Sequence, residues 1–291
     1  METIKEVWPV PFTLFREEGS LDLDAVAPLV DFYIQEGVAG LFALGASGEV
    51  HFLQEEERFS MAKAMVRSVQ GRCRLAVSGI FGHLLSHQVQ GLMALRDLGV
   101  DIPVILLSSL PSSENLGEQL LEIASLTEGP LGIYESFGEK HRLLSSEDTA
   151  RIACTGRFVF MKETSRDLSM YKSKIDAAEG TPFKIYQANL ERLPASLELG
   201  GPGFCGIVAN IWPSLVIRCC NDLQPQVRDE AYTTLMQYQQ ILRNHPYPAS
   251  GKYLLQLRGV PIQSTTRATR SASFNERDRA ELKRFHEQSN A

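Results

Sequence analysis

The residue most suggestive of chemistry is Lys162, which directly follows the apolar run Phe158–Met161. Lysine is rarely buried without a partner. Apolar surroundings favour the uncharged form of an amine. An uncharged amine attacks a ketone to form an imine, and the protonated imine draws electrons from the neighbouring carbon. Alternatively, Lys162 ends its strand by reaching solvent, or pairs with Glu163.

The second chemical feature is the turn Gly45–Glu49, which follows the apolar run Val38–Leu44. Its glycines let the backbone bend tightly and approach a ligand closely. Backbone N–H groups in such a turn bind anions, and Ser47 adds a hydroxyl donor. The turn therefore suits a small carboxylate, although such a segment can also be a plain connection between a strand and a helix.

The third feature is Tyr134, near the end of the apolar run Leu131–Glu135. A phenol at the end of a strand can move protons or donate a hydrogen bond to a substrate carbonyl. The alternative is a half-buried tyrosine whose hydroxyl has a structural partner.

Repeated short apolar runs must position these three features. We expect eight strands, rich in β-branched or aromatic residues and buried on both faces: Val7–Phe12, Val38–Leu44, Arg74–Ile80, Asp101–Leu107, Leu131–Glu135, Phe158–Met161, Phe183–Tyr186 and Phe204–Ala209. Helical patterns lie between them: Leu21–Gln35, Leu53–Val69, His83–Leu98, Leu116–Leu126, Ser146–Cys154, Ser169–Ala178, Glu191–Leu199 and Pro213–Leu223. Gly37 and Gly99 stand where helix C-caps belong.

Alternating strands and helices predict a parallel sheet, and eight such units favour a (β/α)₈ barrel over an open doubly wound sheet. Active sites of such barrels lie where the strands end, so Lys162, Tyr134 and the Gly45–Glu49 turn would share one face. We expect residues 1–223 to form the barrel. Residues 224–291 would be a helical extension packed on it, with helices near 226–243, 247–258 and 275–288.

Composition excludes several classes of protein. The chain of 291 residues has a formal net charge of −6 and no long basic run, which argues against nucleic-acid or anionic-membrane binding. No apolar stretch is long enough to span a bilayer, and the first residues lack a secretory pattern. The five cysteines form no CxxC pair and the histidines show no metal spacing, so we expect free thiols, no metal and a cytoplasmic location.

These pieces occur in an order and spacing that resemble the dihydrodipicolinate synthase / N-acetylneuraminate lyase family of class I aldolases. The resemblance runs from about Pro11 to Arg267. The matching stretches are Pro11–Thr13, Gly45–Glu49 with Leu53 and Glu55–Arg58, Tyr134, Lys162–Ser165, Leu199–Gly203, and Ala209–Asn210 with Pro213.

The resemblance implies a (β/α)₈ barrel with C-terminal helices and a Schiff base between Lys162 and pyruvate. It implies that Tyr134 shuttles protons, linked to Ser47. Ala46, Ser47 and Gly48 would hold the substrate carboxylate, and Cys205 and Gly206, placed on the eighth strand, would line the pocket.

The sequence departs from the family at several places. The segment Leu106–Pro111 lacks the tyrosine that family synthases carry at the end of strand four. The arginine that grips the second substrate has no direct match, and Lys140 or Arg142 would take a related role. Ala188-Asn189 replaces a Gly-Asp pair after strand seven. The aldehyde partner therefore stays open.

We therefore predict a lyase that joins or splits a 2-oxo acid and an aldehyde through a lysine imine, without a separate cofactor. Two alternatives stay open: a dehydratase acting on a sugar-derived 2-oxo acid, and a non-catalytic barrel that only binds the 2-oxo acid. The family resemblance implies a homodimer or homotetramer.

Overall fold

The computed structural model describes residues 4–111, 115–136, 142–268 and 273–289. Eight parallel strands form one sheet in the order β1-β8-β7-β6-β5-β4-β3-β2. The strands are β1 (Glu6–Val7), β2 (Gly40–Ala43), β3 (Arg74–Ser78), β4 (Ile102–Leu106), β5 (Leu131–Tyr134), β6 (Phe158–Glu163), β7 (Lys184–Gln187) and β8 (Gly203–Phe204).

The sheet closes on itself, because the first strand bonds to both of its neighbours. β1 pairs with β8. On its other side, the Ala39 N–H donates to Val7 O at 3.2 Å and the Phe42 N–H donates to Pro9 O at 2.9 Å. The predicted (β/α)₈ barrel is thus confirmed, and the open doubly wound alternative is wrong.

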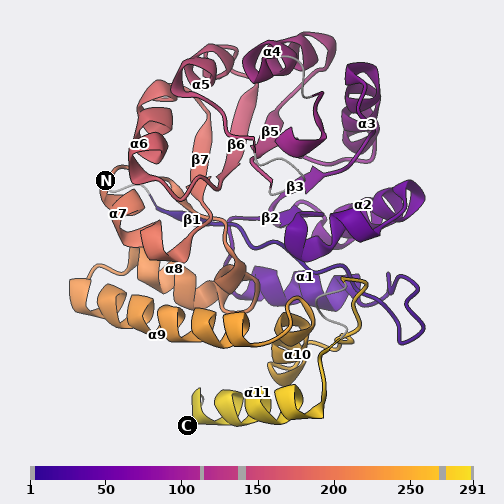
Figure 1. The fold of residues 1–291 in the computed structure, drawn as a ribbon, viewed down its shortest axis with the longest axis vertical. Coiled ribbons are helices and arrows are strands. Elements are labelled where there is room, and N and C mark those ends of the chain that lie inside the picture. The colour runs from indigo at the N-terminus through magenta and orange to yellow at the C-terminus, as the bar shows by residue number, and fades with distance from the viewer. Residues whose placement is uncertain (1–3, 112–114, 137–141, 269–272, 290–291) are drawn as a thin grey trace.

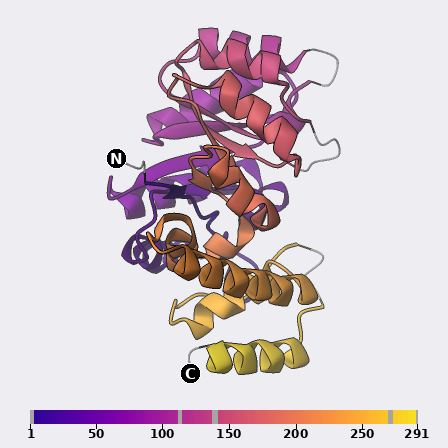
Figure 2. The ribbon, with the colours of Figure 1, turned by 90° about the vertical axis from the view of Figure 1, so that its left-hand side faces the viewer.

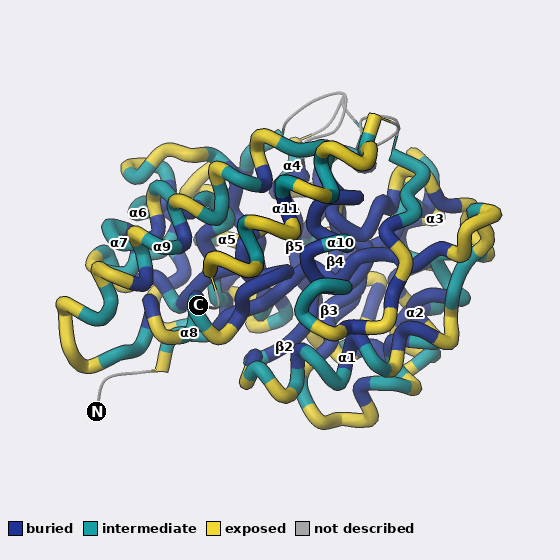
Figure 3. Tube along the Cα trace, turned by 90° about the horizontal axis from the view of Figure 1, so that it is seen from below, coloured by how far each residue is buried: buried dark blue, intermediate teal, exposed yellow. Residues whose placement is uncertain are grey.

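Helices surround the strands (Figure 1). They are α1 (Val26–Gln35), α2 (Glu55–Val69), α3 (Leu85–Asp97), α4 (Leu116–Leu126), α5 (Ser146–Ala153), α6 (Leu168–Ala177), α7 (Leu193–Glu198) and α8 (Pro213–Asn221). Their inner sides are buried and their outer sides are exposed (Figure 3). Gly37 and Gly99 follow α1 and α3 with φ of 82° and 96°, as expected of C-cap glycines.

Aromatic rings fill the barrel interior below the predicted catalytic face. The Phe160 ring lies 4.9 Å from Trp8, 5.2 Å from Tyr186 and 5.4 Å from Phe42, measured between centroids. Gly40 makes room for this cluster, since a Cβ there would lie 2.4 Å from the Trp8 ring. The interior is a packed core, and the predicted catalytic face lies above it.

The first and the last strand are much shorter than predicted. β1 ends at Val7 because Pro9 and Pro11 have no N–H to donate to a ladder. β8 ends at Phe204 instead of Ala209. Its neighbour β7 ends at Gln187, whose carbonyl accepts the Cys205 N–H, and the chain then turns. Cys205 and Gly206 therefore follow β8, which corrects their predicted place on the strand.

The last part of the chain is helical. It contains α9 (Pro225–Asn244), α10 (Ala249–Leu257) and α11 (Glu276–Ser289), and α9 packs on α8. Figures 1 and 2 show these helices together at one end of the molecule. Among the described residues, no helix is both long and apolar enough to cross a membrane.

Candidate active site

Lys162 lies near the carboxyl end of β6 and its side chain is buried, with 7% exposed. Its Nζ is 5.0 Å from the centroid of the Tyr134 ring and 5.8 Å from that of Phe42. In the described part of the chain it has no carboxylate partner. Aromatic faces attract a cation weakly but leave the nitrogen lone pair of the neutral amine unoccupied. The alternatives of a solvated lysine or a Glu163 pair are therefore wrong.

Tyr134 stands directly beside Lys162, because the two residues are partners in the β5–β6 ladder. The side chain is buried, and its ring packs edge-on against Phe42 at 5.4 Å. Burial raises the pKa of the Tyr134 phenol, and the charge of Lys162 opposes that rise. A protonated phenol next to an amine can donate a proton during imine chemistry.

Strand alternation turns the neighbours of both residues away from the site. Glu135 and Glu163 point outward, where their Oε1 atoms accept hydrogen bonds from Lys174 Nζ at 2.7 and 3.2 Å. All three side chains are fully buried between the barrel and α6. Burial raises the pKa of Glu135, although the Lys174 charge opposes this shift. This triad, Glu135–Lys174–Glu163, fixes the backbone on both sides of the reactive pair.

The predicted carboxylate turn is a short 3₁₀ helix, Ala46–Gly48, at the end of β2. A helix start leaves backbone N–H groups without internal partners. Ser47 and Gly48 are buried, while Ala46 is exposed. The Gly48 carbonyl accepts a hydrogen bond from Thr13 Oγ1, and a Cβ at Gly48 would lie 3.2 Å from the Pro11 carbonyl. The loop after β1 therefore holds the turn in place.

The hydrogen-bond partners of Ser47 differ from the predicted one. The expected link to Tyr134 is absent from the described hydrogen bonds. Instead, Ser47 Oγ accepts from Tyr247 OH at 2.7 Å and from Asn210 Nδ2 at 3.1 Å. Tyr247 lies in the loop between α9 and α10, 200 residues away in sequence. The sequence around Tyr247 does not predict a site residue, because a single tyrosine before a proline carries no chemical pattern.

Cys205 and Gly206 lie at the end of β8, on the face that holds Lys162. The Cys205 side chain is fully buried, and burial raises the pKa of its thiol to about 11, with the Lys162 charge acting against that rise. A Cβ at Gly206 would lie 2.5 Å from the Ala188 carbonyl, so only glycine lets the β7 and β8 loops approach so closely.

Of the two basic residues predicted to contact the second substrate, the structure describes Arg142 only. Arg142 donates from Nη1 to the carbonyls of Leu110 and Pro111, at 3.0 and 2.9 Å. It therefore holds the loop after β4 at the mouth of the barrel. Lys140 lies outside the described residues.

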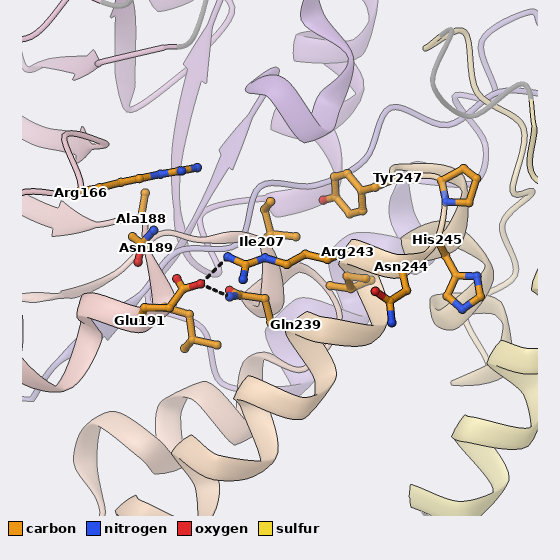
Figure 4. A pocket seen from close by; sticks show the side chains of 13 residues that line it. Arg166, Ala188, Asn189, Glu191, Ile207, Gln239, Arg243, Asn244, His245 and Tyr247 are labelled. Atoms are coloured by element: carbon orange, nitrogen blue, oxygen red, sulfur yellow. Dashed lines mark hydrogen bonds and ion pairs between the residues drawn. The ribbon is translucent and has the colours of Figure 1, made fainter.

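A cavity of about 600 Å³ opens beside this face, between the loops after β6–β8 and the end of α9 (Figure 4). Two cations line it, Arg166 and Arg243, and Arg243 pairs with Glu191. The buried atoms Asn189 Oδ1 and Glu191 Oε2 accept no hydrogen bond within the described structure. Tyr247 also lines the cavity, so this space reaches the hydrogen bonds of Ser47.

A metal site is not evident in the part of the chain that the structure describes. No three His, Cys, Asp or Glu side chains gather there in a way that could hold an ion. The cysteines in the same ranges are free thiols.

The model of the dihydrodipicolinate synthetase family matches residues 3–288 of the chain. The chain belongs to this family. Membership in the dihydrodipicolinate synthetase family confirms the resemblance seen in the sequence and makes the protein an aldolase-type lyase.

Two relatives show how far the similarity extends. The 4-hydroxy-tetrahydrodipicolinate synthase of Laribacter hongkongensis is 26% identical over 210 residues, covering 72% of each chain. The enzyme of the same name from Bacillus subtilis is 25% identical over 265 residues, covering 87% of this chain and 88% of its own.

Solved structures agree on the fold. A prophage protein of the dihydrodipicolinic acid synthase family from E. coli K12, in complex with pyruvate, has a TM-score of 0.85 at 22% identity and covers 99% of both chains. The chloride-inhibited dihydrodipicolinate synthase of Acinetobacter baumannii, complexed with pyruvate, has a TM-score of 0.82 at 22% identity, again over 99% of both chains.

Proposed function

We propose that Lys162 forms an imine with pyruvate or another 2-oxo acid, and that the enzyme then makes or cleaves a carbon–carbon bond with an aldehyde. The observation that carries this proposal is the buried Nζ of Lys162, facing the Tyr134 ring without a carboxylate partner in the described structure. Pyruvate in the two solved relatives of the family supports the choice of 2-oxo acid.

The steps follow from general imine chemistry. The neutral amine adds to the ketone carbon, and the resulting carbinolamine loses water when the departing hydroxyl takes a proton, which we assign to Tyr134. Removal of a proton from the adjacent carbon converts the imine into an enamine. The enamine carbon adds to the aldehyde, whose oxygen takes up a proton. Water then hydrolyses the imine, which frees the product and the lysine. Cleavage is the reverse sequence.

We assign the substrate carboxylate to the turn Ala46–Gly48. The backbone N–H groups at the start of this turn, with the Ser47 hydroxyl, are suited to an anion. Cys205 and Gly206 would line the opposite side of the pocket. The thiol of Cys205 is protonated at neutral pH, so it contributes a wall without a charge.

The cavity of Figure 4 would take the aldehyde half. Its unpaired buried acceptors, Asn189 Oδ1 and Glu191 Oε2, need donors such as ligand hydroxyls. The cations Arg166 and Arg243 also line this cavity and favour an anionic group in it. Arg142 and Lys140 stay candidates for contacts with the second substrate. A hydroxylated, acidic aldehyde fits these features.

The same acceptors favour a second candidate, a dehydratase acting on a sugar-derived 2-oxo acid. The imine of Lys162 would acidify the adjacent carbon in either reaction. A panel of sugar acids separates the two: the lyase releases pyruvate, whereas the dehydratase releases water and retains the carbon chain.

Borohydride trapping tests the proposal directly. Wild-type protein incubated with pyruvate and borohydride should gain the mass of one reduced pyruvate, located on Lys162 by peptide mapping. Lys162→Met should gain nothing, while Lys172→Met, at an exposed lysine of α6, should be trapped like wild type. No adduct on wild-type protein at saturating pyruvate would rule out the imine. Trapping without turnover of any aldehyde or sugar acid would favour the non-catalytic binding barrel.

A further inference from the structure

Three polar side chains from distant parts of the chain meet behind the carboxylate turn: Ser47, Asn210 and Tyr247. Ser47 belongs to the turn after β2, Asn210 ends the 3₁₀ helix after β8, and Tyr247 precedes α10. Ser47 and Asn210 are buried, and Tyr247 is half-buried at the wall of the cavity.

The Asn210 amide is fixed by the backbone. Its Oδ1 accepts the Val10 N–H at 2.6 Å, and an N–H can only donate. The other amide atom is therefore the NH₂ group. It donates to Ser47 Oγ at 3.1 Å and to Tyr247 OH at 2.9 Å.

The Tyr247 hydroxyl receives a hydrogen bond from Asn210, so its own hydrogen is available to Ser47 Oγ, 2.7 Å away. Burial raises the pKa of this phenol well above its usual value, and the phenol stays protonated at neutral pH. Its ring packs against Phe12, with centroids 5.7 Å apart. The ring contact fixes the position of Tyr247, and the protonated hydroxyl donates to Ser47.

Ser47 Oγ thus accepts two hydrogen bonds, which occupy both of its acceptor positions. Its hydrogen must point in a third direction, and in the described structure it has no acceptor. The serine follows β2 at the carboxyl end of the barrel, on the face that carries Lys162. The remaining hydrogen of Ser47 is therefore left for a ligand bound at this face.

We propose that Asn210 and Tyr247 are positioning residues that fix Ser47 as a hydrogen-bond donor to the carboxylate of the 2-oxo acid. This inference rests on the imine proposed at Lys162. Because Tyr247 comes from the C-terminal extension of the same chain, the orientation of Ser47 requires no second copy of the protein. A freely rotating serine would present its lone pairs to the anion part of the time, and the carboxylate would bind less tightly.

The variant Tyr247→Phe tests this, since it keeps the ring and removes only the hydroxyl. We measure the ligand concentration that half-saturates borohydride trapping on Lys162, for pyruvate and for hydroxyacetone, a ketone without a carboxylate. Loss of an oriented hydrogen bond to a charged group should raise the value for pyruvate about tenfold or more. The value for hydroxyacetone should stay within about twofold of wild type.

Two further variants make the result specific. Asn210→Asp keeps the hydrogen bond from the Val10 N–H but replaces the donor to Ser47 with an acceptor, so the Ser47 hydroxyl would donate to Asp instead. The half-saturating concentration should then rise for pyruvate and stay unchanged for hydroxyacetone. In a Ser47→Ala background, Tyr247→Phe should have no additional effect. The matched control is Tyr171→Phe, another buried tyrosine, whose hydroxyl donates to Ile185 O at 2.9 Å; both ligands should bind as in wild type.

The outcomes separate this inference from the proposed function. If wild-type protein is not trapped by pyruvate, the imine itself is wrong. If wild type is trapped, three results would overturn the positioning role. Tyr247→Phe could bind pyruvate as tightly as wild type, could lose affinity for pyruvate and hydroxyacetone equally, or could weaken pyruvate binding further in the Ser47→Ala background. Thermal unfolding of each variant confirms that it is folded at the assay temperature.

Discussion

At the scale of residues, adjacent side chains of β6 point to opposite faces of the sheet. Lys162 faces the aromatic interior, whereas Glu163, the next residue, faces α6 and bonds to Lys174. The pleat of a strand imposes this separation. It keeps the Glu163 carboxylate paired with Lys174, so Glu163 does not hold the Lys162 amine in an ion pair.

Tyr134→Phe should slow trapping of pyruvate about a hundredfold or more, because the carbinolamine loses its nearby proton donor. The ring contact with Phe42 would remain, so the fold should be unaffected. Because burial raises the pKa of the Tyr134 phenol, its ionisation should not reduce the wild-type rate between neutral and moderately alkaline pH. Stopped-time trapping across that range checks both statements. An unchanged rate in the variant would remove Tyr134 from the proton path.

Cysteine reactivity offers a second check at this scale. Cys205 is buried and the pKa of its thiol is raised to about 11, so little nucleophilic thiolate exists at pH 8. Cys154 is exposed. Iodoacetamide on folded protein should therefore modify Cys154 and spare Cys205 until denaturant is added. Peptide mapping measures this order, and early modification of Cys205 would contradict the described packing beside Lys162.

At the scale of elements, the buried triad Glu135–Lys174–Glu163 ties α6 to the ends of β5 and β6. Glu135 Oε1 also accepts the Leu144 N–H at 2.8 Å, and its Oε2 accepts the Thr164 N–H at 3.3 Å. One carboxylate therefore joins two catalytic-face loops to a helix. Removing its counter-charge would leave two buried anions, which costs more than losing an exposed pair.

Lys174→Met should lower the free energy of unfolding by about 3–5 kcal/mol at neutral pH. Burial raises the pKa of Glu135, so the folded state favours the protonated carboxyl over the ionised one. The contribution of Glu135 to the free energy of unfolding is therefore present at low pH and is lost as the pH rises through the raised pKa. The deficit of the variant should therefore shrink in acidic buffer, where the carboxyls are protonated. Urea unfolding at several pH values measures this.

Lys172→Met is the matched control on the same helix. Its partner Asp176 is also exposed, and such pairs contribute less than about 1 kcal/mol. Equal losses for the two variants, or a Lys174→Met deficit that grows as the pH falls, would contradict the account of the triad.

At the scale of the whole molecule, the C-terminal part of the chain hydrogen-bonds to Glu49, which directly follows the proposed carboxylate turn Ala46–Gly48. Glu49 is buried with a left-handed φ of 54°, and its carboxylate accepts from Lys252 Nζ at 2.7 Å. Thr266 Oγ1 and the Arg267 N–H also donate to it, at 2.6 and 2.8 Å. We propose that the barrel, residues 1–223, and the extension, residues 224–291, form one cooperative unit around this contact.

Lys252→Met should therefore destabilise the whole protein by about 3–5 kcal/mol and also weaken pyruvate trapping, since the turn after β2 loses support. Lys283→Met, at an exposed position of α11, should have neither effect. Urea unfolding followed by intrinsic fluorescence, together with the trapping assay, measures both. A second, separate transition for the extension in wild-type protein would contradict a single cooperative unit.

Assembly is a separate prediction at this scale. The expected homodimer or homotetramer is checked by sedimentation velocity. If Tyr247 orients Ser47 within one chain, dilution to monomer should leave pyruvate trapping on Lys162 intact. Loss of trapping on dilution would show that a second copy completes the site.

Local patterns in the sequence were enough for the barrel, for most helix bounds and for the shared face of Lys162, Tyr134 and the Gly45–Glu49 turn. Such features depend on residues close together in the chain: apolar runs, glycine turns, and the rule that parallel strands end on one side. They did not set the end of β8, which stops where β7 offers no further partner.

Tertiary structure alone decided which side chains meet. Tyr247 and Asn210 reach Ser47 from sequence distances of 200 and 163 residues, and Lys252 reaches Glu49 from 203. No periodicity records such contacts, because they depend on how α9 and α10 pack against the closed barrel. The sequence determined that Lys162, the proposed imine-forming amine, would lie at the mouth of a barrel. The packing of distant segments decided which hydroxyls and charges surround it.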